Sequence, residues 1–164
     1  MTERSRDVLR GKYLSLGTGE LVAASVFVVV AATAIAPRFG WPAQLALWFA
    51  AGPLFLVLIQ GGGYWLAARR WVGRGAMPTR LARLYRALRV ADPILLAGGL
   101  VGVWIWWPAS RVHALTAVLV WIFGEVEYLN YFVVRLSYPI RSWPTGVRQR
   151  RIPRLVQDIQ SSSR

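Results

Sequence analysis

Residues Val118–Pro139 read VLVWIFGEVEYLNYFVVRLSYP, and this stretch decides how the rest of the sequence is interpreted. It is apolar enough to lie in a membrane, yet it contains four polar or ionisable side chains among its aromatic residues. An ionisable group at membrane depth costs roughly 2.5 to 3.5 kcal/mol on insertion scales, so it normally faces a protein interior or a water-filled cavity. Other segments must therefore receive these side chains, which are Glu125, Glu127, Asn130 and Arg135.

The composition of the 164-residue chain is typical of a membrane protein. Hydrophobic residues make up 55% of it, the mean hydropathy is +0.40, and the apolar residues are gathered in long runs. The absence of cysteine excludes disulfides and thiolate metal sites. The single histidine, His113, excludes a bis-histidine haem site within one chain. We therefore expect neither a cofactor nor a metal.

Four apolar runs predict an all-α integral membrane protein with four transmembrane helices, since each span uses about 20 residues. Short turns join the first span to the second and the third to the fourth, so we expect two antiparallel hairpins. The predicted spans are at about 20–36, 43–68, 92–107 and 112–136.

Three larger regions follow from these spans. We expect a basic lead at 1–19, a four-helix membrane domain at 20–138, and a basic, partly disordered tail at 139–164. The lead and first run also resemble a secretory signal peptide ending at Ala34-Ile35-Ala36. Pro37 would then be the first mature residue, and more apolar runs follow, so we favour an uncleaved span.

The positive charges indicate an orientation. Segments 1–19, 69–89 and 135–164 hold 18 of the 20 Lys and Arg residues, whereas Arg38 and Arg111 are the only two in the opposite turns. By the positive-inside rule, both termini lie in the cytoplasm. Arginine outnumbers lysine 19 to 1, which with the abundant Ala and Val indicates a GC-rich bacterial genome. We therefore expect a location in the bacterial inner membrane.

The loop before the third span contains an amphipathic segment at 79–89. At about 100° per residue, its apolar side chains fall within one arc and its arginines occupy the opposite half. We expect an interfacial helix that contacts anionic lipid headgroups. No motif accompanies the charge, so nucleic acid is not an expected partner. The residues expected to contact lipid are Arg80, Arg83, Arg86 and Arg89.

Polar residues from all four spans are expected in the inner half of the bundle. Glu127 lies eight residues, roughly 12 Å, from Arg135 at the predicted inner interface. We expect one binding site in which Glu127 is the principal charged ligand and Arg135 is its counter-ion. The other expected ligands are Asn130, Tyr131, Gln60, Glu20 and Asp92.

Each of these residues also has a structural interpretation. Glu20 suits the first turn of a helix, and Asp92 before Pro93 is typical of a helix N-cap. Gln60 precedes three glycines that favour close helix packing, and the polar face of the fourth span is suited to interhelical hydrogen bonds. The sequence leaves these alternatives open.

Glu125 lies about 200° around the helix from Glu127 and faces a different direction. Either the fourth span is central and contacted on all sides, or one face meets another protomer or a partner subunit. For Glu125 we expect such an interface or a protonated buried acid. Four helices rarely enclose a transport pathway alone, so the expected assembly is a homo-oligomer or a complex with other membrane subunits.

These features favour a small membrane protein that binds or translocates a small cation, a proton or a lipid headgroup. The alternatives are an accessory or scaffold subunit and a membrane enzyme acting on a lipid or quinone. An enzyme is less favoured, because the sequence has no serine elbow, Walker, HExxH or dinucleotide motif. Lys12, the only lysine, lies outside the spans, which excludes a retinal Schiff base.

Overall fold

A computed structural model describes residues 3–73, 75–134 and 152–162, and this part of the chain contains no strand. Four of its helices are long and apolar enough to cross a membrane, which confirms the predicted all-α fold with four such helices. The helices are α1 (Glu3–Val30), α2 (Trp41–Ala68), α3 (Thr79–Ile105), α4 (Arg111–Phe132) and α6 (Arg154–Ser161). A π turn (Ala31–Ile35) and a 3-10 turn (Ala36–Arg38) follow α1.

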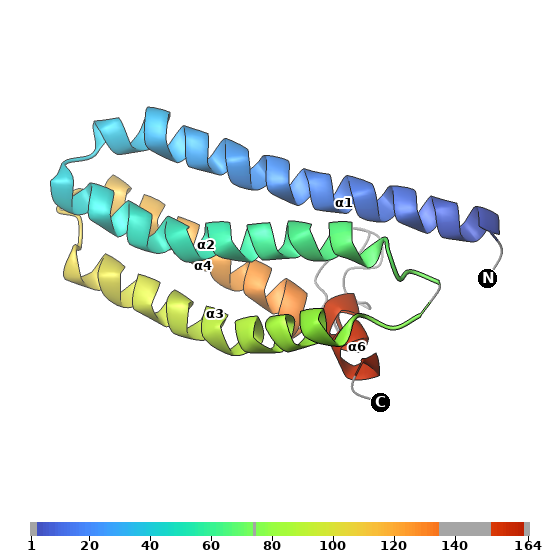
Figure 1. Ribbon diagram of the computed structural model, residues 1–164. Helices are drawn as coiled ribbons and strands as arrows, with labels where there is room; N and C mark the ends of the chain where they lie inside the picture. The colour runs from blue at the N-terminus through green and yellow to red at the C-terminus, as the bar shows by residue number, and fades with distance from the viewer. Residues whose placement is uncertain (1–2, 74, 135–151, 163–164) are drawn as a thin grey trace, which may run out of the picture.

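The central helix of the bundle is α2, which packs against α1, α3 and α4 (Figure 1). Twelve residues of α2 are buried, whereas α4 buries only five. Many of the buried positions of α2 are Ala or Gly, which let neighbouring helix backbones approach closely. The fourth span, which the sequence presented as a possible central helix, instead packs chiefly on α2 and leaves one side exposed.

The outer surface of the bundle is apolar. Large hydrophobic side chains are exposed along all four long helices, for example Val26, Leu56, Leu100 and Leu119. Between 17% and 44% of the residues in the most apolar window of each helix are buried inside the protein. Such a surface would be unfavourable in water, so we treat α1 to α4 as membrane-spanning.

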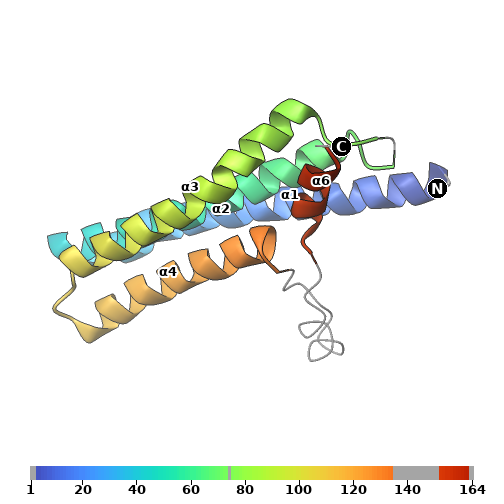
Figure 2. The same cartoon turned by 90° about the horizontal axis from the view of Figure 1, so that it is seen from below.

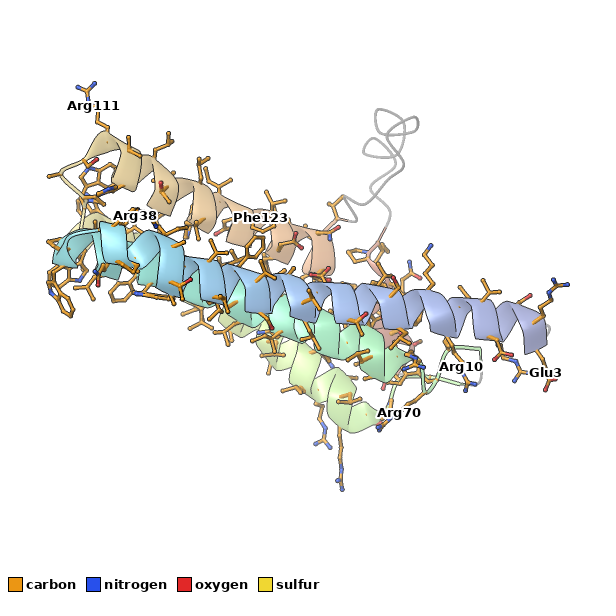
Figure 3. All side chains as sticks on the ribbon, turned by 90° about the horizontal axis from the view of Figure 1, so that it is seen from above. Glu3, Arg10, Arg38, Arg70, Arg111 and Phe123 are labelled. Atoms are coloured by element: carbon orange, nitrogen blue, oxygen red, sulfur yellow. The ribbon has the colours of Figure 1, made fainter. Side chains whose placement is uncertain are left out.

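Charged side chains gather near the two ends of the bundle. Figure 3 shows Arg38 and Arg111 at one end, and Arg10 and Arg70 toward the other. The second of these ends is where α2 finishes, α3 begins and α6 packs (Figure 2).

A proline inside α2 shapes its contact with α3. Pro53 has no N–H, so the carbonyl of Phe49, four residues earlier, lacks its intrahelical donor. This carbonyl points at Gly99 of α3, where an added Cβ would lie only 2.6 Å from the oxygen. Glycine at position 99 therefore allows α3 to pack against this part of α2.

The separate interfacial helix predicted at 79–89 is not confirmed. These residues form the first turns of α3, which continues without a break past Asp92. Tyr85 is buried, and Leu81 and Leu88 pack against the same apolar cluster, so most of the apolar side of this segment contacts protein, whereas Leu84 is exposed. The opposite side is exposed and carries Arg80, Arg83, Arg86 and Arg89.

Two regions at the chain ends differ in extent from the predicted spans. α1 already begins at Glu3, so most of the predicted basic lead is helical. In the tail, α6 packs against α3 and α4. Residues 135–151, including Arg135, lie outside the described residues, and so does the prediction of disorder there.

Close approach of α1 and α2 yields the first testable prediction. A Cβ added to Gly17 or Gly62 would lie 3.0 Å from the carbonyl oxygen of the other glycine and 2.8 Å from a leucine side chain. We predict that Gly62→Leu lowers the free energy of unfolding by about 1–3 kcal/mol, the usual cost of overpacking. Unfolding by SDS in mixed micelles, followed by circular dichroism, measures this change.

The matched control is Gly98→Leu. A Cβ at Gly98 would meet nothing within 4 Å, so a leucine there extends into lipid. We expect this variant to keep the stability of the natural protein. Equal stability of the two variants would contradict the close packing of α1 on α2.

Candidate functional site

The described hydrogen bonds place the predicted polar residues in two groups that both involve α2. The first group, which we call the acid pair group, joins α1 and α4 and contains Glu20, Glu127, Asn130 and Tyr131. The second group, the Asp92–Gln60 pair, joins α3 to α2. The residues expected in one site thus form two hydrogen-bonded groups, which contact α2 at the neighbouring residues Gln60 and Gly61. The predicted counter-ion Arg135 lies outside the described residues.

Tyr131 connects three helices in the acid pair group. Its hydroxyl donates a hydrogen bond to Oε1 of Glu20 on α1 at 2.7 Å and accepts one from the indole of Trp65 on α2. Its ring packs on Gly61, where any Cβ would collide with it. Trp65 was not predicted as a site residue, although it lies one helical turn after Gly61. Tyr131 is thus held in place from both sides.

Glu127 lies one turn before Tyr131 on the same face of α4. Asn130 donates a hydrogen bond to its carboxylate, and Glu20 is close enough for the two acidic charges to repel each other. Both acids are half-buried, and among the described residues neither forms an ion pair with Lys or Arg. Two carboxylates so placed favour uptake of a positive charge.

The Asp92–Gln60 pair is more deeply enclosed. Asp92 is 1% exposed, and its Oδ1 accepts a hydrogen bond from Nε2 of Gln60 at 3.0 Å. The other oxygens of the two side chains, Oδ2 of Asp92 and Oε1 of Gln60, are buried and have no hydrogen-bond donor. A buried polar atom left unpaired costs about 1–3 kcal/mol, and more when it is charged. The pair therefore has two acceptors that a positive charge would satisfy.

Two tyrosine hydroxyls fix the backbone around this pair. Tyr85 donates to the carbonyl of Gln60 at 2.9 Å, and Tyr128 donates to the carbonyl of Arg89 at 3.1 Å. The Arg89 carbonyl has no intrahelical donor, because Pro93 lacks the N–H that would reach it. Both hydroxyls donate to backbone oxygens, so neither donates to Oδ2 of Asp92 or to Oε1 of Gln60.

The interpretation of Asp92 as a helix N-cap is wrong. α3 begins at Thr79 with Pro78 at the cap position, so Asp92 lies in the middle of the helix. The Asp-Pro dipeptide resembles a helix start, but the segment before it has helical periodicity and packs on the bundle core. The helix therefore continues through the dipeptide and buries the carboxyl.

Glu125 is half-buried on α4. Tyr128, one turn later, is within electrostatic range of Glu125, Arg89 and Asp92. Glu127 is near Glu20 of α1, whereas Glu125 is near Tyr128 of its own helix. A subunit interface at Glu125 remains a prediction.

An interaction that the sequence reasoning missed fixes α6. Asp158 is 6% exposed, accepts hydrogen bonds of 2.9 Å from both the Tyr64 hydroxyl and the Trp71 indole, and pairs with Arg154 at 3.1 Å. The sequence feature that could have predicted α6 is its set of apolar residues, Leu155, Val156 and Ile159, which are buried with Asp158. The many arginines of the tail obscured this short amphipathic pattern.

Comparison of the chain with protein-family models, with curated proteins and with solved structures found no match.

The buried contacts of Asp158 give the second prediction. We expect Asp158→Asn to loosen α6, because hydrogen bonds to a charged group contribute about 1.5–3 kcal/mol each. Hydrogen–deuterium exchange of the amides in 154–161, in lipid nanodiscs, should become faster. The control is Asp7→Asn, since the Asp7 side chain is 75% exposed. Unchanged exchange in Asp158→Asn would show that these contacts do not hold α6.

Proposed function

We propose that this protein binds a proton or a small cation inside the membrane and carries it across. It does so either as a homo-oligomer or as a subunit of a larger complex. The observation that supports this most strongly is the Asp92–Gln60 pair. Asp92 is 1% exposed, and one oxygen of its carboxyl group has no hydrogen-bond donor. The amide oxygen of its partner Gln60 has no donor either. Ionisable residues of this kind within membranes commonly belong to ion or proton pathways.

The chemistry of the acceptors supports a positive ligand over a lipid phosphate. The unpaired atoms at this position are oxygens of a carboxyl and an amide, which attract a cation or a proton and repel an anion. The acid pair group adds two further carboxylates, Glu20 and Glu127. It contacts α2 through the Tyr131 ring at Gly61, the residue after Gln60. The arginines that could bind phosphate, by contrast, lie toward the ends of the bundle, as Arg70 and Arg111 do in Figure 3.

The expected direction of access follows from charge. The end of the bundle with residues 69–73, the start of α3 and α6 is basic, and we assign it to the cytoplasm of a bacterium by the positive-inside rule. Both polar groups lie in the half of the bundle nearer this end, since Gln60 is eight residues before the end of α2 at Ala68. The exposed Arg80, Arg83, Arg86 and Arg89 would contact anionic headgroups on this side.

A second function, that of an accessory subunit, is favoured by α4. This helix lies at the edge of the bundle, yet Glu125, Glu127 and Asn130 are only half-buried at membrane depth. Exposure of such groups to lipid is costly, so a neighbouring subunit or second copy would cover them. This role is compatible with ion binding at Asp92.

Flux through the reconstituted protein gives the third prediction. We expect proteoliposomes to show proton or sodium flux under an imposed gradient, and Asp92→Asn to reduce it by about tenfold or more. Loss of one ionised ligand worth at least about 1.4 kcal/mol has this effect on affinity. A pH-sensitive dye and a sodium-sensitive dye inside the vesicles distinguish the two ions.

Asp7→Asn is the control for this experiment as well, because it removes one acidic charge at an exposed position. Its flux should equal that of the natural protein. Flux that survives Asp92→Asn at full rate would contradict the proposal. If the natural protein carries no ion but retains partner subunits on purification in mild detergent, the accessory role is favoured instead.

A further inference from the structure

We infer that the ligand of the Asp92–Gln60 pair is a proton, held on Oδ2 of Asp92 and donated to Oε1 of Gln60. The inference rests on the proposed function and names its ligand. In this step an O–H bond of a hydronium ion breaks and leaves water, while Oδ2 of the carboxylate forms the new O–H bond and the group becomes a carboxylic acid.

The complementarity of the two side chains is the first argument. A carboxylic acid and a primary amide can form two hydrogen bonds in a ring, with the amide N–H on one oxygen and the acid O–H on the amide oxygen. The first of these bonds is present, from Gln60 Nε2 to Asp92 Oδ1 at 3.0 Å. The two atoms required for the second are the two that have no donor. One added proton therefore satisfies both atoms at once.

The surrounding backbone argues against a metal ion. Hard cations take six or more oxygen ligands, or keep several waters. Three backbone carbonyl oxygens within four residues of Gln60 or Asp92 already accept side-chain hydrogen bonds: that of Gln60 from Tyr85, that of Arg89 from Tyr128, and that of Leu96 from the Trp121 indole at 2.8 Å. Within the described residues, no group of three or more acidic, His or Cys residues suits a metal.

The charged neighbours also favour a proton. α2 contributes the neutral amide of Gln60 and contains no charged residue. α3 itself carries Tyr85 and the exposed Arg80, Arg83, Arg86 and Arg89, and α4 contributes Tyr128 and Glu125.

α6 packs on α3, but its Asp158 and Arg154 pair with each other. None of the described ion pairs involves Asp92, so its carboxylate has no cation to neutralise it. A proton removes the charge directly.

The pair then has two states with different geometry. In the protonated state the ring is closed and uncharged, which suits an enclosed position between α2 and α3. When the proton leaves, the carboxylate oxygen and the amide oxygen repel each other, so the Gln60 amide must turn or the helices must separate. Release of the proton is thereby linked to a change at the α2–α3 contact.

The test is infrared spectroscopy of the purified protein in lipid, with aspartate labelled by ¹³C at the carboxyl carbon. The chain contains three aspartates, and of these Asp7 is exposed and Asp158 is paired with Arg154. We expect a labelled C=O band of a protonated carboxylic acid near neutral pH. It should disappear in Asp92→Asn and persist unchanged in Asp7→Asn.

A second variant keeps the test valid if Asp92→Asn does not fold. Gln60→Met retains Asp92 and removes the amide, so the band should remain but shift to higher frequency as the O–H loses its acceptor. A band at the same frequency would show that the acid does not donate to Gln60, and would overturn the inference.

Spectra in choline chloride and in sodium chloride distinguish a failure of the proton assignment from a failure of the proposed function. If labelled Asp92 is ionised in choline chloride at neutral pH, the proton assignment fails. If sodium chloride abolishes the band, the ligand is a metal ion, and cation transport survives while the proton assignment fails. If the band behaves as expected but proteoliposomes carry no ion, the proton site stands and the transport function fails.

Discussion

Inside a membrane, every polar group of the chain has to find its partner within the protein, because lipid offers neither donors nor acceptors. This constraint explains most of the specific contacts of the bundle. Pro53 leaves the Phe49 carbonyl without an N–H, and Gly99 of α3 packs against it. Pro93 does the same to the Arg89 carbonyl, which the Tyr128 hydroxyl satisfies from α4. Among the described residues, Tyr85, Tyr128 and Trp121 donate to backbone carbonyl oxygens, and Tyr64, Trp71 and Tyr131 donate to carboxylates.

Against this background the Asp92–Gln60 pair is the exception. Its neighbours have their partners, yet two of its own side-chain oxygens have none. Proteins tolerate such a cost mainly at functional sites, where binding of the ligand recovers it. The acid pair group is less extreme, since Tyr131 and Asn130 donate to Glu20 and Glu127 and both acids are half-buried. We therefore regard Asp92, and not Glu127, as the principal charged ligand.

Hydropathy was sufficient to predict four long helices, and the spacing of Glu127, Asn130 and Tyr131 was sufficient to place them on one helix face. Glu20 was expected near them only because each of the four spans carries a polar residue in its predicted inner half. What the sequence did not reveal was which helix is central, because Ala and Gly at buried positions of α2 give a weak hydropathy signal but allow close packing. Asp92 was misread because a local Asp-Pro signal was outweighed by packing of the preceding residues. Asp158 was missed because its two donors, Tyr64 and Trp71, are distant in sequence.

The central claim is that the Asp92–Gln60 pair is retained for binding and not for holding α2 and α3 together. The most direct measurement is the free energy of unfolding of the double variant Asp92→Leu/Gln60→Met, in which apolar side chains of similar shape replace both partners. If the pair exists to bind a proton, replacement of both partners by apolar side chains should leave the bundle as stable as before or more stable. A loss of several kcal/mol in this variant would show that the pair is a structural contact and would contradict the account.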